Sequence, residues 1–427
     1  MVEIDRPDRI PELAARGFRV AMQGRRGPVV IVLPENILTE KAAVSDAPSV
    51  DAALSWPAPP DIEQLGMLLS KAKAPFVILG GSGWDEAASK RIARFAERFD
   101  LPVATSFRRA SLFDAGHPNY AGDLGVGPDP RLKARITDAD LILLIGGRMS
   151  EMPSLSYTLL DVPSATKQLV GACASRRGRA WSRLSADARD SSEPDRLCSA
   201  VDTLRPAAAP AWAGEAAKAN CEYVKWTETP RELPGPFQYG KIVAWWRDRL
   251  PTNAIICNGA GNYTGWLHRH HRFHAFAAQL APTSGSMGYG MPAAVLAKRQ
   301  FPDRVIVAFA GDGCFLMNGQ EFSTAVRYSA AIIVILIDNS QYGTIPMHQE
   351  REYPGRVIGT QLQNPDFALY ARAFGGYGER VERTQEFGPA FECALASGKP
   401  AILHCLLDPR AISVGKDSAP TSAKAMR

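Results

Sequence analysis

The stretch VIVAFAGDGCFLMNGQEFSTAVRYSAAIIVILIDNSQYGT, residues 305–344, contains two apolar runs separated by a segment of helical length. The runs 305–310 and 332–337 are rich in β-branched residues, and an acid and turn-forming residues follow each of them closely. Such runs are typical of buried parallel strands. A strand, helix, strand unit collects ligands beyond the carboxyl ends of its strands, and Asp312 and Asn339 fall at those ends.

A carboxylate and an amide brought together at such an edge suit a hard divalent cation such as Mg²⁺. This ion prefers oxygen ligands and often shares them with phosphates. Gly311 and Gly313 remove side-chain bulk on both sides of Asp312, so the backbone can approach a phosphate. Gly-Asp-Gly alone is usually a turn. The pairing with Asn339 after one further strand makes the metal interpretation more specific.

The spacing of Asp312 and Asn339 resembles the GDG...N motif of thiamine diphosphate-dependent enzymes, and the surrounding sequence is similar to acetolactate synthase large subunits. The resemblance implies thiamine diphosphate and Mg²⁺ as cofactors, a small 2-oxo acid as substrate, and decarboxylation or carboligation by a homo-oligomer. It also implies that Mg²⁺ binds the side chains of Asp312 and Asn339 and the main-chain oxygen of Gln341. Further cofactor-binding residues implied in the same way are Gly311, Gly313, Tyr342 and Gly343.

A glycine-rich loop, TSGSMGYGMPAA at 283–294, opens a predicted helix. By composition it is a turn and a helix start, and Met287 could equally be a core residue. The resemblance implies instead that the Gly285 carbonyl accepts the cofactor's 4'-amino group and that Met287 bends the cofactor. This bend would bring the 4'-imino nitrogen near thiazolium C2 and ease removal of its proton.

The catalytic acid is the part of the family's machinery that the sequence does not supply. The family uses a glutamate from the upstream part of its N-terminal pyrimidine-binding domain, and no segment here matches that region. Glu35, in Leu-Pro-Glu-Asn, is more simply a polar turn residue. The alternative function is therefore a catalytically silent cofactor-binding protein, or one that is active only with a partner chain that supplies the glutamate.

Strands alternating with helices predict an α/β fold with parallel sheets, in three parts. Residues 1–40 resemble a remnant of the pyrimidine-binding domain. Residues 61–205 are predicted to form a middle, Rossmann-like domain and residues 237–410 a C-terminal diphosphate-binding domain. Linkers are expected near 41–60 and 206–214, and a loose tail over residues 409–427.

Residues 171–200 interrupt this pattern, because they are rich in Arg, Ser and Ala and poor in large apolar residues. They predict neither a strand nor an amphipathic helix, although the domain needs its next strand there. One hypothesis is that the segment is translated out of frame, since G+C-rich codons read in a shifted frame give such a mixture. The other interpretation is a disordered surface loop.

Three other motifs have simpler interpretations. Gly80, Gly81 and Gly83 follow a strand but do not have the dinucleotide-binding spacing, so a tight turn is predicted. Relatives can carry FAD in this middle domain, but nothing in the sequence identifies that ligand. The turn 258–262, which follows a strand, is predicted to face a phosphate or the cofactor. A histidine cluster without a metal-ligand spacing is interpreted as a solvated helix end, and its members are His268, His270, His271 and His274.

Composition limits the remaining function classes. The 427 residues are 46% hydrophobic and carry a net charge of +5, and no basic patch suggests nucleic acid. Seven scattered cysteines without a paired motif indicate reduced thiols in a cytoplasmic protein. The sequence has neither a signal-peptide pattern nor a membrane-length apolar run.

Overall fold

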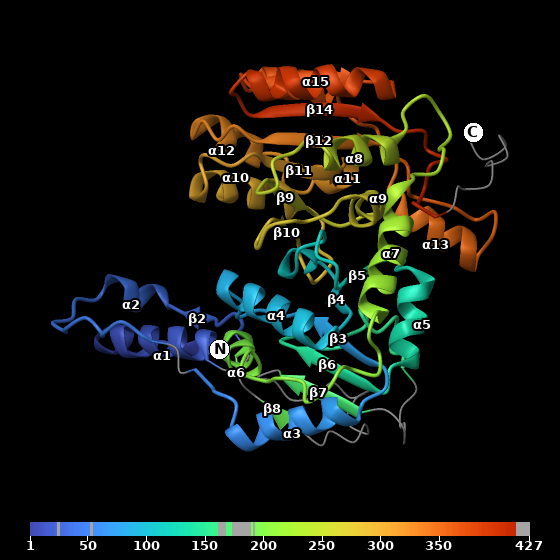
Figure 1. Ribbon diagram of the computed structural model, residues 1–427. Coiled ribbons are helices and arrows are strands. Elements are labelled where there is room, and N and C mark those ends of the chain that lie inside the picture. Colours follow the sequence, from blue (N-terminus) through green and yellow to red (C-terminus); the bar gives the residue numbers. More distant parts are fainter. Residues whose placement is uncertain (24–25, 52–53, 161–167, 173–188, 191–192, 416–427) are drawn as a thin grey trace. The chain divides into compact units, whose positions relative to one another are not determined.

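The computed structural model (Figure 1) describes six ranges of the chain, which are 1–23, 26–51, 54–160, 168–172, 189–190 and 193–415. Its contacts divide the chain into two compact units. One unit contains residues 1–101 and 136–213, and the other contains residues 102–135 and the chain from Gly214 onward. The α/β fold class with parallel sheets is confirmed, whereas the three domain boundaries stay a prediction.

The second unit is built on a parallel sheet of six strands in the order β10-β9-β11-β12-β14-β13. The strands are β9 (Ile255–Asn258), β10 (Gln279–Leu280), β11 (Ile306–Gly311), β12 (Ile333–Asp338), β13 (Tyr377–Val381) and β14 (Ala401–Leu406). Gly311 lies opposite Ile337 in the pairing of β11 with β12. Asp312 and Asn339 therefore leave the sheet at the same edge, as the sequence predicted.

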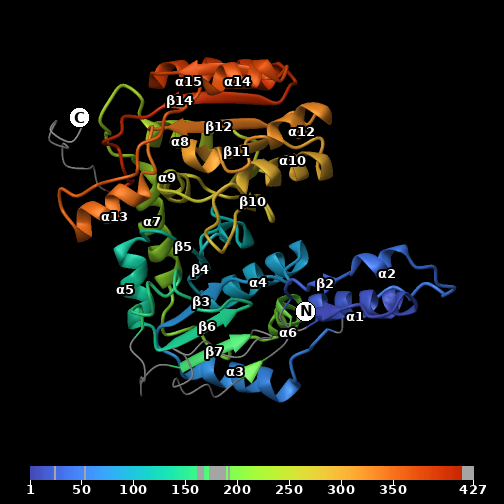
Figure 2. The same ribbon diagram turned by 180° about the vertical axis from the view of Figure 1, so that it is seen from behind.

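Helices cover both faces of this sheet (Figures 1 and 2). One face packs against α8 (Tyr239–Arg247), α9 (Tyr263–His270) and α15 (Thr384–Ala396). The other packs against α10 (Gly290–Gln300), α11 (Asp312–Phe315), α12 (Glu321–Arg327) and α14 (Phe367–Ala373). Phe309 belongs to the first core and Ala308 to the second, because successive side chains of a strand point to opposite faces. Burial on both faces explains the unbroken apolar runs in the sequence.

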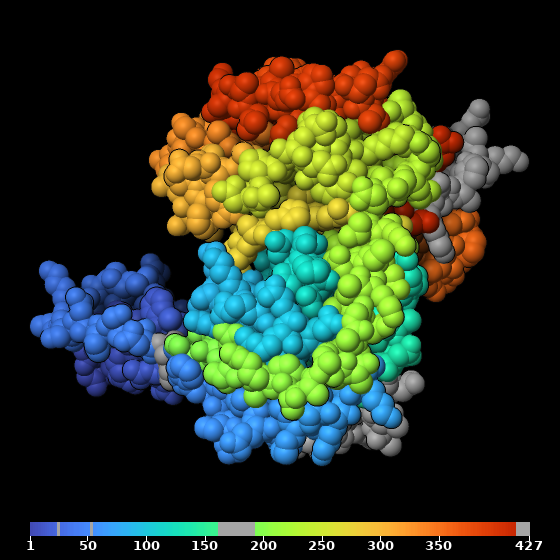
Figure 3. Space-filling view, viewed as in Figure 1, coloured from blue at the N-terminus to red at the C-terminus, as the bar shows by residue number. Residues whose placement is uncertain are grey.

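The red atoms of α15 and the adjoining chain form the outer layer of the same unit in the space-filling view (Figure 3). Residues 102–135 add the parallel pair β4 (Val103–Ser106) and β5 (Tyr120–Leu124). Helix α7 (Glu215–Glu228) packs on β5, with the rings of Tyr120 and Tyr223 4.9 Å apart. Other elements of this unit are α13 (Thr344–Glu352), the 3₁₀ turn Ala110–Leu112 and the first residues of α5 (Pro130–Asp138).

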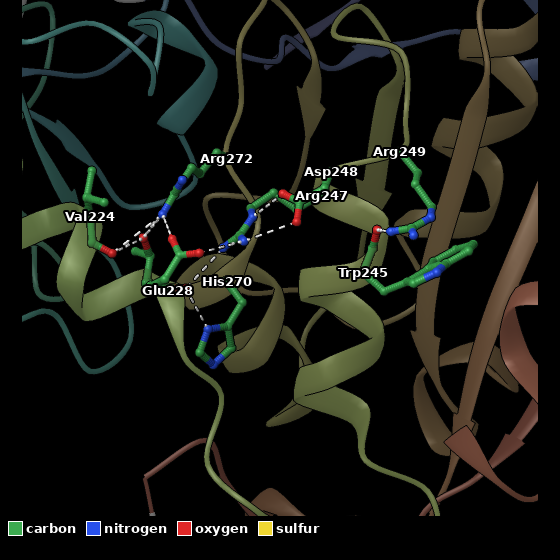
Figure 4. Close-up of polar contacts among 9 residues, drawn as sticks. Val224, Glu228, Trp245, Arg247, Asp248, Arg249, His270 and Arg272 are labelled. Atoms are coloured by element: carbon green, nitrogen blue, oxygen red, sulfur yellow. Dashed lines mark hydrogen bonds and ion pairs between the residues drawn. The ribbon is translucent and has the colours of Figure 1, made fainter. Parts of the chain in front are cut away.

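A polar network fixes the end of α7 to α8 and α9 (Figure 4). The Glu228 carboxylate accepts hydrogen bonds from Arg272 at 2.7 Å and from Arg247 at 3.4 Å. Nδ1 of His270 lies 3.0 Å from the main-chain oxygen of Thr227. Because the Arg247 side chain is only 6% exposed, its pairing with Glu228 and Asp248 compensates a cation that would otherwise be buried alone.

The interpretation of the histidine cluster as a solvated helix end is wrong. His270 and His271 are 2% and 8% exposed, because the last turn of α9 packs beneath α7 and against Trp246. His274 instead pairs with Asp114 at 2.9 Å. In the part of the chain that the structure describes, no group of three or more His, Cys, Asp or Glu residues could hold a metal ion by itself.

The first unit contains the parallel strands β3 (Pro75–Leu79), β6 (Leu141–Ile145), β7 (Gln168–Ala172) and β8 (Arg189–Asp190), in the order β3-β6-β7-β8. Its helices include α3 (Pro59–Lys71) and α4 (Glu86–Phe99). Asp85 caps α4 by accepting a hydrogen bond from the Ala88 N–H at 2.6 Å.

The N-terminal residues of this unit form a small substructure of their own. Strands β1 (Val2–Glu3) and β2 (Ile31–Val32) pair in parallel, and α1 (Ile10–Met22) and α2 (Glu35–Thr39) accompany them with the 3₁₀ turn Pro7–Arg9. Ile4, Leu13 and Ile37 form its core. Glu35 is exposed and begins α2, so it is a helix residue rather than the predicted turn residue.

The structure describes only part of the atypical segment 171–200. Residues 173–188 and 191–192 lie outside the described residues, and so does most of the segment on which the out-of-frame hypothesis rests. The prediction of neither a strand nor an amphipathic helix is wrong at two places in the segment. Strand β8 (Arg189–Asp190) pairs with β7, and α6 (Pro194–Val201) buries Leu197, Cys198 and Val201. Pro194 at the first helical position and Cys198 acting as a small apolar residue explain the helix.

Two further sequence expectations concern membranes and thiols. No helix in the described ranges is long and apolar enough to cross a membrane. The cysteines that the description covers are free thiols.

Candidate cofactor site

A cavity of about 260 Å³ lies at the carboxyl ends of β9, β11 and β12 in the second unit. Every residue predicted to bind the cofactor lines it, although the residues come from separate loops. They are Gly285, Met287, Gly311, Asp312, Gly313, Asn339, Gln341, Tyr342 and Gly343. The structure therefore brings the predicted set together, and the role of each residue stays a prediction.

Asp312 is the acid of this cavity. It begins α11 and is 3% exposed. Its Oδ1 accepts a hydrogen bond from the Gly313 N–H at 2.9 Å, and its Oδ2 accepts one from the Asn364 amide at 2.8 Å. Burial, with the charge of Asp338 in addition, raises the pKa of Asp312 to about 6. Within the described ranges no ion pair compensates this carboxylate, so the site is chemically suited to a cation.

A second buried acid, Asp338, adjoins the metal-ligand candidates. The Asn364 amide also donates to Oδ1 of Asp338 at 2.8 Å, and Nε2 of His404 lies 2.9 Å from Oδ2. Burial opposes ionisation, but the contact with His404 and the Ser340 N–H outweigh it and lower the pKa of Asp338. Asn364 thus bridges the two carboxylates by donating a hydrogen bond to each. Asn364 was not predicted as a site residue, because nothing in the sequence around it signals this contact.

The loop after β12 presents Asn339 and Gln341 to the cavity. The Tyr342 N–H donates to the Thr360 oxygen and the Leu362 N–H to the Ser340 oxygen, each at 2.8 Å. The Gln341 side chain donates to the Pro409 oxygen at 2.7 Å. These bonds fix the loop. The Gln341 main-chain oxygen, the predicted metal ligand, accepts a hydrogen bond from the Gly343 N–H at 2.8 Å.

The glycine-rich loop forms another wall of the cavity. Gly285 has a φ of +76°, and its N–H donates to the Pro282 oxygen at 3.0 Å. At the other end, the Gly288 N–H donates to Sγ of Cys314 at 3.3 Å, and the Asn318 amide donates to the Gly288 oxygen at 3.1 Å. Met287 is 39% exposed and lines the cavity, so it is not a core residue.

The predicted turn 258–262 also reaches the cavity, through Ala260, Gly261 and Asn262. The Asn262 amide donates to the Ile412 oxygen at 2.7 Å and accepts from the Thr344 hydroxyl at 2.9 Å. This side chain therefore joins three segments that are far apart in the sequence.

The chain after β14 completes the cavity, with Leu407, Ala411 and Ile412 in its lining. Ala411 and Ile412 are 1% and 6% exposed. The expectation of a loose tail is therefore wrong for residues 409–415, which pack on the turn at Asn262, while 416–427 lie outside the described residues. The sequence of this segment contains no sign of this packing, because its few apolar residues lie among polar ones and proline.

A second, smaller cavity of about 40 Å³ in the same unit contains an acid and an imidazole that the sequence did not single out together. Oδ2 of Asp123 and both ring nitrogens of His268 are shielded from solvent and have no hydrogen-bond partner among the described residues. Burial raises the pKa of Asp123 to about 8, although the Gly125 N–H and Arg108 oppose this. Burial also lowers the pKa of His268 to about 3, and the charge of Arg108 adds to the effect.

These shifts predict how stability depends on pH. Because the folded pKa of Asp123 lies above the unfolded value of about 3.9, its contribution to stability is full below that value and is lost as the pH rises through about 8. Between pH 5 and pH 9 the wild type should therefore lose more stability than Asp123→Asn. Urea unfolding of both proteins at each pH measures the difference, and parallel profiles would contradict the assignment.

Comparison with protein families identifies two domains. Residues 259–405 match the family described as thiamine pyrophosphate enzyme, C-terminal TPP binding domain. Residues 62–172 match the thiamine pyrophosphate enzyme, central domain. The chain carries the central and C-terminal domains of a thiamine pyrophosphate enzyme. Its cavity lies within the matched C-terminal domain and the residues that adjoin it.

Similar proteins differ in their reactions. The acetolactate synthase isozyme 2 large subunit of Escherichia coli (strain K12) is 26% identical over 416 residues, which cover 94% of this chain and 72% of that protein. The sulfoacetaldehyde acetyltransferase of Rhodobacter capsulatus is 28% identical over 441 residues, or 95% of this chain and 73% of that protein. The relatives of this chain therefore include acetolactate synthases and proteins with other names.

A solved structure shares the fold. The benzoylformate decarboxylase from Polynucleobacter necessarius has a TM-score of 0.76 and 20% identity, and the match covers 96% of this chain and 76% of that chain. The chain thus spans about three quarters of the length of that protein. The predicted loss of an N-terminal domain stays a prediction.

Proposed function

We propose that this chain binds thiamine diphosphate with Mg²⁺ in the cavity of the second unit and acts on small 2-oxo acids, by decarboxylation or carboligation of acetolactate synthase type. The observation that carries the proposal is the buried Asp312 carboxylate, which lacks a cationic partner in the described ranges and shares one cavity with Asn339. The relatives' names and the two domain matches support the cofactor class.

The residues present fit the two ends of such a cofactor. Asp312, Asn339 and the Gln341 oxygen offer hard oxygen ligands to Mg²⁺, and Gly311 and Gly313 leave room for the diphosphate. The Gly285 carbonyl would accept the amino group of the other end, and Met287 would set its orientation. When bound, thiamine diphosphate supplies the electron sink for loss of CO₂. No observation in the described residues supports FAD.

Calorimetry with thiamine diphosphate, with and without Mg²⁺, tests binding. Release of CO₂ from pyruvate and from benzoylformate tests turnover and separates small from aromatic 2-oxo acids. Mg²⁺-dependent binding with turnover of either acid supports the proposal. Absence of binding at millimolar cofactor would overturn it.

A second candidate is a cofactor-binding protein that turns over only when a partner chain supplies the activating glutamate. It is favoured by the cavity lining, in which Asp312 is the acid and no glutamate appears among the described residues. Binding without turnover by the chain alone would favour this candidate. Turnover by the purified chain would exclude it.

Association between copies is also expected, because apolar side chains are exposed beside the cavity. Met287 and Ile345 line it and are 39% and 49% exposed. Met317, which is 47% exposed, adjoins Gly288 in the glycine-rich loop. An apolar surface of this kind favours association. Sedimentation at increasing concentration should show oligomers, and a monomer throughout would count against this expectation.

A further inference from the structure

Arg108, in the segment after β4, combines two features that lower stability. It is 3% exposed, and its φ of +58° lies in the left-handed region, which costs a residue with a Cβ atom about 1–2 kcal/mol. Its Nε has no hydrogen-bond partner among the described residues, and no ion pair there compensates its charge. The guanidinium lies over the Phe107 ring, 4.7 Å from its centroid. Backbone strain and a buried cation without an ion pair at one position point to a functional constraint.

The contacts of Arg108 lead to the cofactor loop. Its guanidinium donates to the Pro282 oxygen at 2.6 Å. The same oxygen accepts the Gly285 N–H at 3.0 Å, so Arg108 braces the turn that ends at Gly285. Two residues later, the Ala110 N–H donates to Oε1 of Gln279 at 3.0 Å. Residues 108–110 therefore form hydrogen bonds with the chain immediately before the glycine-rich loop.

The same guanidinium lies behind the wall of the cavity. Burial lowers the pKa of Arg108, while electrostatic interactions with Tyr263 and Cys314 oppose this. Tyr263 and Cys314 both line the cavity, and Cys314 accepts the Gly288 N–H at the far end of the loop. The loop is thus held from both ends, by Arg108 at its start and by Cys314 and Asn318 at its end.

We propose that Arg108 is a positioning residue that fixes the turn presenting Gly285 and Met287, and so sets the orientation of the cofactor's reactive end. The inference rests on the proposed function for its catalytic consequence. Because Mg²⁺ and the diphosphate would bind at Asp312, on a different loop, loosening this turn should affect turnover more than affinity. A misplacement of about 1 Å can reduce a rate on the order of 100-fold.

The test compares Arg108→Met, which keeps the aliphatic stem but removes charge and donors, with Arg108→Lys, which restores both. Arg249→Met is the control, because Arg249 lies on the surface over Trp245. We expect Arg108→Met to reduce kcat on the order of 10-fold or more, with the thiamine diphosphate Kd changed by less than about 3-fold. Arg108→Lys should recover a large part of kcat, and Arg249→Met should match the wild type.

Hydrogen exchange of the protein without cofactor gives a readout that does not depend on activity. Amides 283–290 should exchange faster in Arg108→Met than in the wild type and the control, with thermal stability unchanged or raised. Unchanged exchange and kcat, or a parallel loss of Kd, kcat and thermal stability, would overturn the proposal. If Arg108→Met does not fold, Gln279→Leu, which removes the neighbouring bond, applies the same exchange test. Failure of the wild type to bind cofactor would refute the proposed function instead.

Discussion

Replacing Asp312 by Asn should weaken Mg²⁺-dependent binding of thiamine diphosphate on the order of 100-fold or more, since even outer-shell changes at metal sites cost about 10–100-fold. The carboxylate is the acid in the cavity lining and has no cationic partner in the described ranges. Asn keeps the shape and one oxygen but removes the charge that compensates a divalent cation. Titration calorimetry of variant and wild type at fixed Mg²⁺ measures the change.

The matched control is Asp303→Asn, an acid exposed before β11 at the opposite end of the same strand. It makes the same chemical change in the same unit, so its affinity should equal that of the wild type. An Asp312→Asn protein that binds with unchanged affinity would remove the metal assignment from this residue. Raising Mg²⁺ should partly recover binding in Asp312→Asn, whereas a collapsed cavity would show no such recovery.

This site could be predicted from the sequence because each of its marker motifs lies in one short, contiguous segment. Strand β11 and the following Gly-Asp-Gly are contiguous in sequence, and β12 repeats the pattern one helix later. Parallel strands place equivalent ends at the same edge of the sheet, so the sequence alone predicts that Asp312 and Asn339 lie close together. The predicted strands 305–310 and 332–337 agree to within one residue with β11 (Ile306–Gly311) and β12 (Ile333–Asp338).

The missed features depend on contacts between distant segments. Asn364 bridges Asp312 and Asp338 across 52 and 26 residues, and it lies between Gln363 and Pro365 in no recognisable motif. Ile412 closes the cavity because Asn262, 150 residues away, holds its main-chain oxygen. Periodicity and spacing carry no information on such pairs, since neither partner lies in a repeated pattern.

Gly81→Ala should destabilise the first unit by about 3 kcal/mol or more, the sum of a left-handed φ and an overpacked contact. Gly81 has a φ of +71°, and a Cβ placed there would lie 1.7 Å from the Gly146 oxygen. Because that atom belongs to the backbone of the turn after β6, the two strand ends would have to separate. Urea unfolding with hydrogen exchange in β3 and β6 measures the loss in this unit.

Gly127→Ala isolates the contribution of the backbone conformation, because Gly127 has a φ of +70° and nothing within 4 Å of its added Cβ. This control should cost only about 1–2 kcal/mol. If Gly81→Ala cost no more free energy of unfolding than the control, the close approach of the two turns would not explain the need for glycine at position 81.

The same pair of variants distinguishes two roles for the glycines after β3, which are ligand binding and close packing of the backbone. A turn built for a dinucleotide keeps the space beside its glycine open for phosphate, whereas at Gly81 the Gly146 carbonyl fills that space. The predicted tight turn therefore follows from backbone packing. The cofactor cavity is formed by residues of the second unit alone. Gly81→Ala protein that remains folded should therefore still bind thiamine diphosphate. A loss of binding without unfolding would show that these glycines serve a ligand.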